Sequence, residues 1–167
     1  VADLRAIGSP FPFLASWPFA NQCDPEQSLS RTPINGVVLD AAYANLTRWV
    51  RDGVPPPRAS RIELEGAATP QARVVLDRFG NAVGGYRTPY LDVPIATYHT
   101  SSAGETFCPE LARTEPFDWE RLTTLYRSPK AYRARLDAEV ARAVRERRMT
   151  PGDAMRMRAE PVVPARQ

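Results

Sequence analysis

The fold of this chain is decided by the stretch Asp77-Arg78-Phe79-Gly80-Asn81-Ala82-Val83-Gly84-Gly85-Tyr86-Arg87-Thr88-Pro89 and by the string Asp92-Val93-Pro94-Ile95-Ala96-Thr97-Tyr98 that follows it. Glycine and asparagine tolerate positive backbone φ angles, so the first string predicts a turn at residues 79–82. Two short strands are expected before it, at 61–65 and 73–76. Residues 86–98 are expected to be extended, and Pro89 and Pro94 confine them to a sheet edge or a strap. The stretch therefore predicts a small two-stranded excursion and no doubly wound sheet.

Upstream of this stretch, apolar residues recur at helical spacing. They are Val38, Ala42, Leu46, Trp49 and Val50. The pattern predicts a helix over residues 37–53, with Gly53 as its stop and Pro55–Pro57 preventing continuation. We expect Trp49 on the buried face and Arg48 and Arg51 to be partly exposed.

Downstream, residues 117–160 are expected to form the C-terminal helices. Asp118 to Tyr126 predicts a short helix, with Phe117 as a possible staple. Ser128 followed by Pro129 predicts the cap of a longer helix, and Thr150-Pro151-Gly152-Asp153 predicts the start of a final one. The intervening residues 99–116 are expected to be a loop that holds His99 and Cys108.

The first 36 residues contain no periodic element, since prolines interrupt every candidate helix or strand. They carry the apolar side chains Phe11, Phe13, Leu14, Trp17 and Phe19. We interpret residues 1–36 as a strap laid over a core, with the wall of an apolar ligand pocket as the alternative. An exposed aromatic patch of this size is costly in a monomer, so something is expected to cover it.

Composition is that of a globular protein of 167 residues with a net charge of +3, and 17 prolines make irregular connections frequent. Residues 128–167 carry ten Lys/Arg against five Asp/Glu, whereas residues 1–127 carry twelve against fourteen. We interpret the basic helical end, 142–158, as a solvated helix face and expect no nucleic-acid partner. No apolar run is long enough for a membrane span, and no signal peptide is visible. Because the chain begins at Val1, we expect a processed chain or a fragment.

Three motif-like features carry no chemistry in this interpretation. Asn45-Leu46-Thr47 matches a glycosylation sequon, but its position within a helix makes a chance match. Gly84-Gly85 lacks the Lys-Ser/Thr and the helix of a phosphate loop, so both are turn glycines. One histidine and two distant cysteines give no metal-ligand spacing, and we expect neither a metal nor a cofactor.

A serine-hydrolase mechanism cannot be assembled from these residues. The nucleophile elbow Gly-x-Ser-x-Gly is absent from the sequence. The single histidine, His99, is conceivable as a general base, but such a residue is far more often a loop or packing residue. We therefore assign no catalytic residue. The two cysteines, Cys23 and Cys108, fit either a disulfide or two unrelated thiols.

The opening strings resemble the C-terminal portion of the bacterial alpha/beta-hydrolase-domain family, large exported proteins with a serine-esterase-like fold. The most specific part is Gly-Asn…Gly-Gly…Arg-x-Pro…Asp-Val-Pro-x-Ala-x-Tyr, residues 80–98. Looser similarity covers Thr32-Pro33-Ile34-Asn35, Leu39-Asp40-Ala41-Ala42, Glu115-Pro116-Phe117-Asp118 and Thr150-Pro151-Gly152-Asp153-Ala154, while residues 1–31 match weakly.

The resemblance implies that the serine, acid and histidine of the triad all precede Val1, and that His99 falls in a variable loop. It favours a disulfide between Cys23 and Cys108, because members carry cysteines at similar places. It also implies a secreted or periplasmic location, and a partner that is the upstream part of the same hydrolase or a companion chain.

Taken together, these inferences predict an α/β fragment, the C-terminal part of an α/β-hydrolase fold, with mainly helices plus a small β-hairpin and Pro-rich straps. The units are a 1–36 strap, a 37–53 helix, a 61–98 strand excursion and the 117–160 helices, all in one body. The predicted function is a non-catalytic segment of an exported esterase-like protein that completes the fold and shapes the substrate entrance. The alternatives are a stand-alone binding module with an apolar pocket and, more weakly, a basic nucleic-acid-associated protein.

Overall fold

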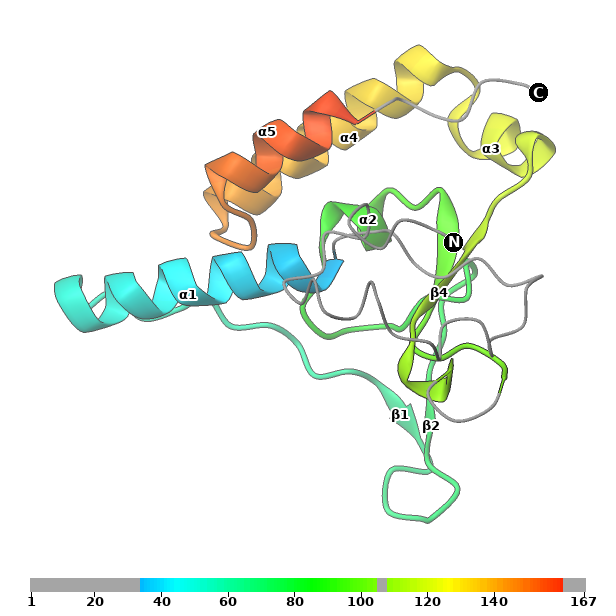
Figure 1. Ribbon diagram of the computed structural model, residues 1–167, viewed down its shortest axis with the longest axis horizontal. Helices are drawn as coiled ribbons and strands as arrows, with labels where there is room; N and C mark the ends of the chain where they lie inside the picture. Colours follow the sequence, from blue (N-terminus) through cyan, green and yellow to red (C-terminus); the bar gives the residue numbers. More distant parts are fainter. Residues whose placement is uncertain (1–33, 105–107, 161–167) are drawn as a thin grey trace.

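The computed structural model describes residues 34–104 and 108–160 and begins with one long helix, α1 (Ile34–Asp52). Figure 1 shows α1 as a separate rod below the α4–α5 pair. Gly53 ends the helix with φ 70°, and its N–H donates to the Trp49 carbonyl at 2.9 Å. The predicted strap aromatics Phe11, Phe13, Trp17 and Phe19 lie outside the described residues.

The predicted buried face of α1 is wrong. The residues that pack on the body are Val37, Ala41 and Asn45. Trp49 is 51% exposed, whereas Arg48 and Arg51 are exposed as expected. The helix carries apolar residues on more than one side, and its buried positions end at Asn45. Periodicity alone therefore could not tell which apolar side is covered.

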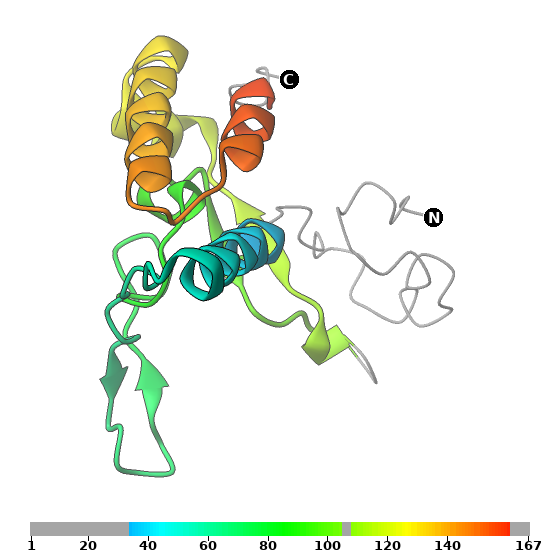
Figure 2. The same cartoon turned by 90° about the vertical axis from the view of Figure 1, so that its left-hand side faces the viewer.

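A β-hairpin follows and extends away from the body (Figure 2). Its strands, β1 (Leu64–Glu65) and β2 (Arg73–Val74), are antiparallel with Leu64 opposite Val74. They lie within the two expected strand ranges but are shorter. Val83 connects the two strands at the base of the hairpin. Its carbonyl accepts a hydrogen bond from the Glu63 N–H at 3.0 Å, and its N–H donates to the Val75 carbonyl at 2.9 Å.

The chain then makes one helical turn where an extended segment was expected. This turn is α2 (Pro89–Asp92), and Val93 N–H donates to the Pro89 carbonyl at 3.0 Å. Proline suits the first helical position, because its fixed φ is already helical and its missing N–H has no partner there. The expectation that all of 86–98 is extended is therefore wrong at residues 89–92.

The second sheet pairs β3 (Ala96–His99) with β4 (Arg113–Pro116), antiparallel, with His99 opposite Arg113. A short 3-10 turn, η4 (Cys108–Glu110), precedes β4. The expected 99–116 loop thus contains a strand. The sequence of β4 is polar and ends in proline, so it has no apolar alternation that would predict a strand.

Three helices complete the fold, namely α3 (Trp119–Tyr126), α4 (Pro129–Arg145) and α5 (Pro151–Ala159). Ser128 and Thr150 cap α4 and α5 as predicted, each accepting a hydrogen bond from a backbone N–H three residues on. Their inner faces form the core together with Val37 of α1, Val93 after α2 and Phe117 after β4. Its buried members are Val37, Val93, Phe117, Leu122, Tyr126, Tyr132, Leu136, Val140, Ala143, Met149, Ala154 and Met157.

Candidate functional site

His99 stands at the end of β3 rather than in a loop, and it faces a carboxylate on the neighbouring strand. Its Nε2 lies 3.0 Å from Oε2 of Glu115, and Arg113 Nη1 lies 3.4 Å from the same oxygen. The hydrogen bond from His99 holds the pKa of the Glu115 carboxyl below its usual range, and Arg113 adds to the effect.

A histidine oriented by a carboxylate supplies two of the three roles of a catalytic triad. The third role needs a hydroxyl or thiol in hydrogen-bond reach of the imidazole. In residues 34–104 and 108–160, no serine, threonine or cysteine side chain hydrogen-bonds to His99. Among the described residues, the pair therefore has no nucleophile to activate.

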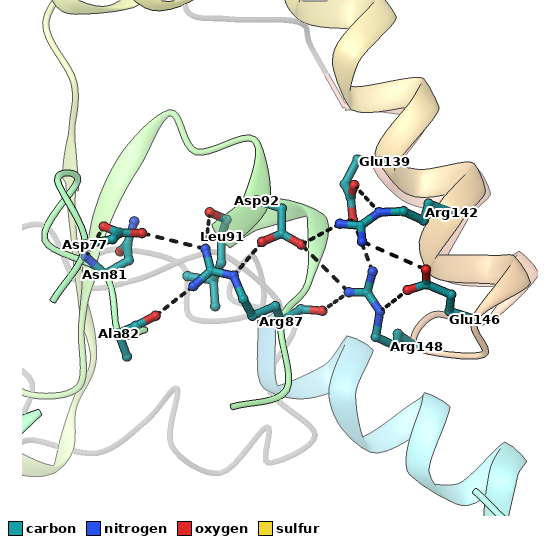
Figure 3. Close-up of polar contacts among 10 residues, drawn as sticks. All are labelled: Asp77, Asn81, Ala82, Arg87, Leu91, Asp92, Glu139, Arg142, Glu146 and Arg148. Atoms are coloured by element: carbon teal, nitrogen blue, oxygen red, sulfur yellow. Dashed lines mark hydrogen bonds and ion pairs between the residues drawn. The ribbon is translucent and has the colours of Figure 1, made fainter. Parts of the chain in front are cut away.

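The densest polar cluster is a network of charged side chains around Arg87 and Asp92 (Figure 3). Arg87 Nε donates to Asp92 Oδ1 at 2.5 Å, Nη1 to the Ala82 carbonyl at 2.7 Å and Nη2 to the Leu91 carbonyl at 2.9 Å. Asp77 Oδ2 lies 3.6 Å from Nη2. The fork-shaped donor set of arginine is thus used to hold the hairpin base against α2.

The same network continues onto α4 and the turn after it. Arg142 Nη2 donates to Asp92 Oδ2 at 3.2 Å, and Arg142 Nε donates to Glu139 Oε2 at 2.7 Å. The hydrogen bond to Glu139 raises the pKa of Arg142. Figure 3 shows Asp92 lying between the Arg87 and Arg142 guanidinium groups.

Arg148 closes the network from the α4–α5 turn. It donates to Glu139 Oε1 at 3.2 Å, to Glu146 Oε2 at 2.8 Å and to the carbonyl of Arg87. Its side chain is 13% exposed, so the interpretation of 142–158 as a solvated face is wrong at this position. The turn folds α5 back along α4, and this places Arg148 over α2.

Three arginines and four carboxylates form this network, and each arginine donates to protein acceptors. A buried ion pair adds little net stability compared with apolar packing, but removing one partner leaves an uncompensated charge. The cluster is therefore suited to fixing the position of the hairpin and of α2 relative to α4. The carboxylates are held by cations rather than left available as general bases.

The apparent sequon at Asn45 lies in a packed contact. The Asn45 side-chain amide donates to the carbonyls of Ala41 and Arg147, both at 2.8 Å, and the residue is 6% exposed. A buried amide nitrogen that already donates two hydrogen bonds is not available for attachment of a glycan. Asn45 instead ties α1 to the α4–α5 turn.

An apolar groove lies between α3 and the start of α4. It is open to solvent, has a cavity volume of about 90 Å³ and is lined by Trp119, Leu122, Thr123, Tyr126, Arg127, Ser128, Pro129 and Tyr132. The Tyr126 and Tyr132 rings pack edge to face with their centroids 5.0 Å apart, and burial raises the pKa of each phenol to about 12. Tyr126 Oη donates to the Pro94 carbonyl at 2.7 Å, which fixes one wall.

Of the two cysteines, Cys108 is fully buried in η4. Cys23 lies outside the described residues, so the pairing of Cys23 with Cys108 stays a prediction. Within the described ranges, no group of three His, Cys, Asp or Glu side chains is placed to hold a metal ion.

Reasoning from the sequence did not assign a role to Arg87, Asp92, Glu139 or Arg148. The sequence does single out Arg87 and Asp92, because they belong to Arg-x-Pro and Asp-Val-Pro, which lie in the most specific part of the family resemblance. Their partners on α4 and its turn lie far along the chain, where a periodic helix pattern gives no indication of ion pairing.

Comparison with known protein families gives a match over most of the chain. A family model described as an alpha/beta hydrolase domain matches residues 9–159. No curated protein and no solved structure matches the chain. In the described part of the chain, no helix has the length and apolarity to cross a bilayer.

Proposed function

The chain belongs to the alpha/beta hydrolase domain family, and we propose that it is a non-catalytic C-terminal segment of an exported, esterase-like member. In this proposal it completes the hydrolase fold and shapes the substrate entrance, and the other part of the fold is its partner. The observation that carries the proposal is a second apolar face on α1.

The outer face of α1 consists of Leu39, Tyr43, Leu46 and Val50. These residues are spaced by four, three and four positions, so they form one stripe. At about 100° per residue, the stripe lies on the opposite side of the helix from Val37 and Ala41, which are buried. Its members are 50–80% exposed.

A helix that is apolar on opposite sides is ordinarily buried between two layers. The described residues cover only one side of α1. A hydrolase fold supplies the second layer, since its helices pack on a central sheet. The described part of the chain contains two two-stranded antiparallel sheets, neither of which lies against the outer face.

The hairpin provides a second uncovered apolar surface. In the β1–β2 register, Leu64 is opposite Val74, and by alternation Ile62 and Leu76 share the same face. All four side chains are at least 44% exposed. Exposed apolar surface of this kind marks interaction sites, which supports a partner for the hairpin as well.

The chemistry of the described residues supports a non-catalytic role. The sequence has no nucleophile elbow, and the His99–Glu115 pair lies at a sheet edge without a bonded nucleophile in the described ranges. We also propose export, which favours oxidation of Cys23 and Cys108 to a disulfide.

The α3–α4 groove favours a second candidate function, a binding module with an apolar pocket. Ligand sites are concave, mainly apolar and carry few polar groups, and this groove has that composition. The two functions differ in whether the outer face of α1 must be covered by another part of a protein. A stand-alone module needs no cover on the outer face, whereas a hydrolase segment does.

The proposal is tested by Leu46→Lys, made both in this chain and in the product of the complete reading frame. In the isolated chain the change should shift the free energy of unfolding by less than about 0.5 kcal/mol, because Leu46 is at the surface. In the longer product it should lower the melting temperature and the ester-hydrolysis rate, since it places a charge in a buried interface.

Thr47→Lys is the matched control, because it adds the same charge at an exposed polar position of the same helix. It should leave both proteins unaffected. Equal effects of Leu46→Lys and Thr47→Lys on the complete product would contradict the proposal. Ester turnover by the purified isolated chain that is lost in His99→Ala would contradict the non-catalytic assignment.

A further inference from the structure

The groove between α3 and α4 has apolar walls that are held in place by buried residues. Leu122, Tyr126 and Tyr132 are each no more than 7% exposed, so the floor belongs to the core. Trp119 forms an outer wall and is 44% exposed. A concavity with a rigid floor and one accessible aromatic wall suits a small apolar chain or ring.

One cationic residue lies in the lining of the groove. Its lining contains Arg127 and no aspartate or glutamate. No hydrogen bond or ion pair joins the Arg127 side chain to any residue in 34–104 or 108–160. The first turn of α4, which begins two residues later, also has no acidic side chain.

The backbone places Arg127 at this position at some conformational cost. Arg127 has φ 62° and ψ −35°, a region that L-residues rarely adopt. The conformation is held by its N–H, which donates to the Thr123 carbonyl at 2.7 Å. A glycine would suit this turn better, so the presence of arginine suggests that its side chain has a use.

We propose that this groove binds a small amphiphile with an apolar chain and a single carboxylate, the chain against Trp119 and the tyrosines and the carboxylate on Arg127. Arginine pairs with carboxylates through two parallel N–H···O bonds, and no competing carboxylate lines the groove. The class includes short fatty acids. The inference does not use the outer face of α1. The opposite, buried side of α1 contacts the body through Asn45, near the other end of α4.

The test is an NMR titration of the full 167-residue chain with octanoate, 1-octanol and acetate as three separate probes. Octanoate should bind about tenfold more tightly than 1-octanol, because a charge-assisted pair adds to the same apolar contact. Acetate should bind more weakly than both. The shifted amides should lie around the groove, at Thr123, Arg127 and Tyr132.

Arg127→Gln should abolish the preference for octanoate while leaving 1-octanol binding unchanged. Arg145→Gln is the matched control, since Arg145 is an exposed cation at the far end of α4. It should change neither affinity. Trp119→Ala should weaken both octanoate and 1-octanol.

Equal affinities for octanoate and 1-octanol would overturn the proposal, as would a preference that survives Arg127→Gln. Shifts that fall on Tyr43, Leu46 and Val50 instead of the groove would also overturn it, and would show instead that the outer face of α1 collects apolar molecules. These results do not depend on the hydrolase-segment proposal. That proposal is tested on the outer face of α1, whereas the titration tests the α3–α4 groove.

Discussion

Arg87 and Asp92 form the central ion pair of the molecule, with Arg87 Nε 2.5 Å from Asp92 Oδ1. The second carboxylate oxygen of Asp92 accepts from Arg142 on α4 at 3.2 Å. One aspartate therefore joins the segment after the hairpin to the C-terminal helices. Its side chain is 17% exposed, so the pair is largely shielded from solvent.

Asp92→Asn should lower the free energy of unfolding by about 3 kcal/mol, because it removes the carboxylate that Arg87, Arg142 and Arg148 share. Chemical denaturation measures this. Asp52→Asn is the control, since Asp52 pairs with its exposed neighbour Arg51 and should not change the midpoint. A loss at Asp92 no larger than at Asp52 would show that the network does not fix the fold.

Gly84→Ala should destabilise the chain strongly. A Cβ at Gly84 would lie 2.1 Å from the Arg61 carbonyl oxygen, and the residue has φ 78°. Both effects together should cost about 3 kcal/mol, and they disturb the base of the hairpin.

Gly36→Ala tests the same substitution where neither effect operates. Nothing lies within 4 Å of the added Cβ, and Gly36 is in the first turn of α1. It should stabilise by up to about 1 kcal/mol through helix propensity. Destabilisation of equal size at both glycines would contradict the close approach at Gly84.

Thr88→Val should be neutral or stabilising by about 1 kcal/mol. Thr88 Oγ1 is buried and has no hydrogen-bond partner in the described part of the chain, and valine has nearly the same shape. Thermal unfolding of the two proteins decides the sign. A loss above about 1 kcal/mol would reveal a polar partner for this hydroxyl.

Cys23 and Cys108 should be bonded in oxidised protein. Peptide mapping by mass spectrometry without reductant should recover a cross-linked pair. In the chain-entropy model, closing a loop of this length stabilises the folded state by about 4 kcal/mol. Reductant should therefore lower the denaturation midpoint. Two alkylated thiols in protein that was never reduced would contradict the pairing.

Local signals explain what could be predicted of the helices. Ser128-Pro129 and Thr150-Pro151 start α4 and α5, because a hydroxyl cap followed by proline satisfies the helix terminus within four residues. Tyr132, Leu136 and Val140 repeat once per turn and are buried as the pattern indicates. These features depend only on neighbours along the chain.

Features that depend on distant residues could not be predicted in the same way. The polar strand β4 forms because β3 lies beside it, and Trp49 stays exposed because nothing in the described chain covers that part of α1. Arg148 meets Glu139 and the Arg87 carbonyl only after the α4–α5 turn has formed. The groove at Arg127 likewise needs two helices to meet.

The most direct test of the account is whether the outer face of α1 becomes covered in the complete protein. Hydroxyl-radical footprinting of Tyr43 should be compared between the isolated chain and the product of the complete reading frame, with buried Tyr126 as the protected reference. The account predicts fast oxidation of the Tyr43 ring in the isolated chain and a rate close to that of Tyr126 in the complete product. Equally fast oxidation of Tyr43 in the two proteins would contradict it.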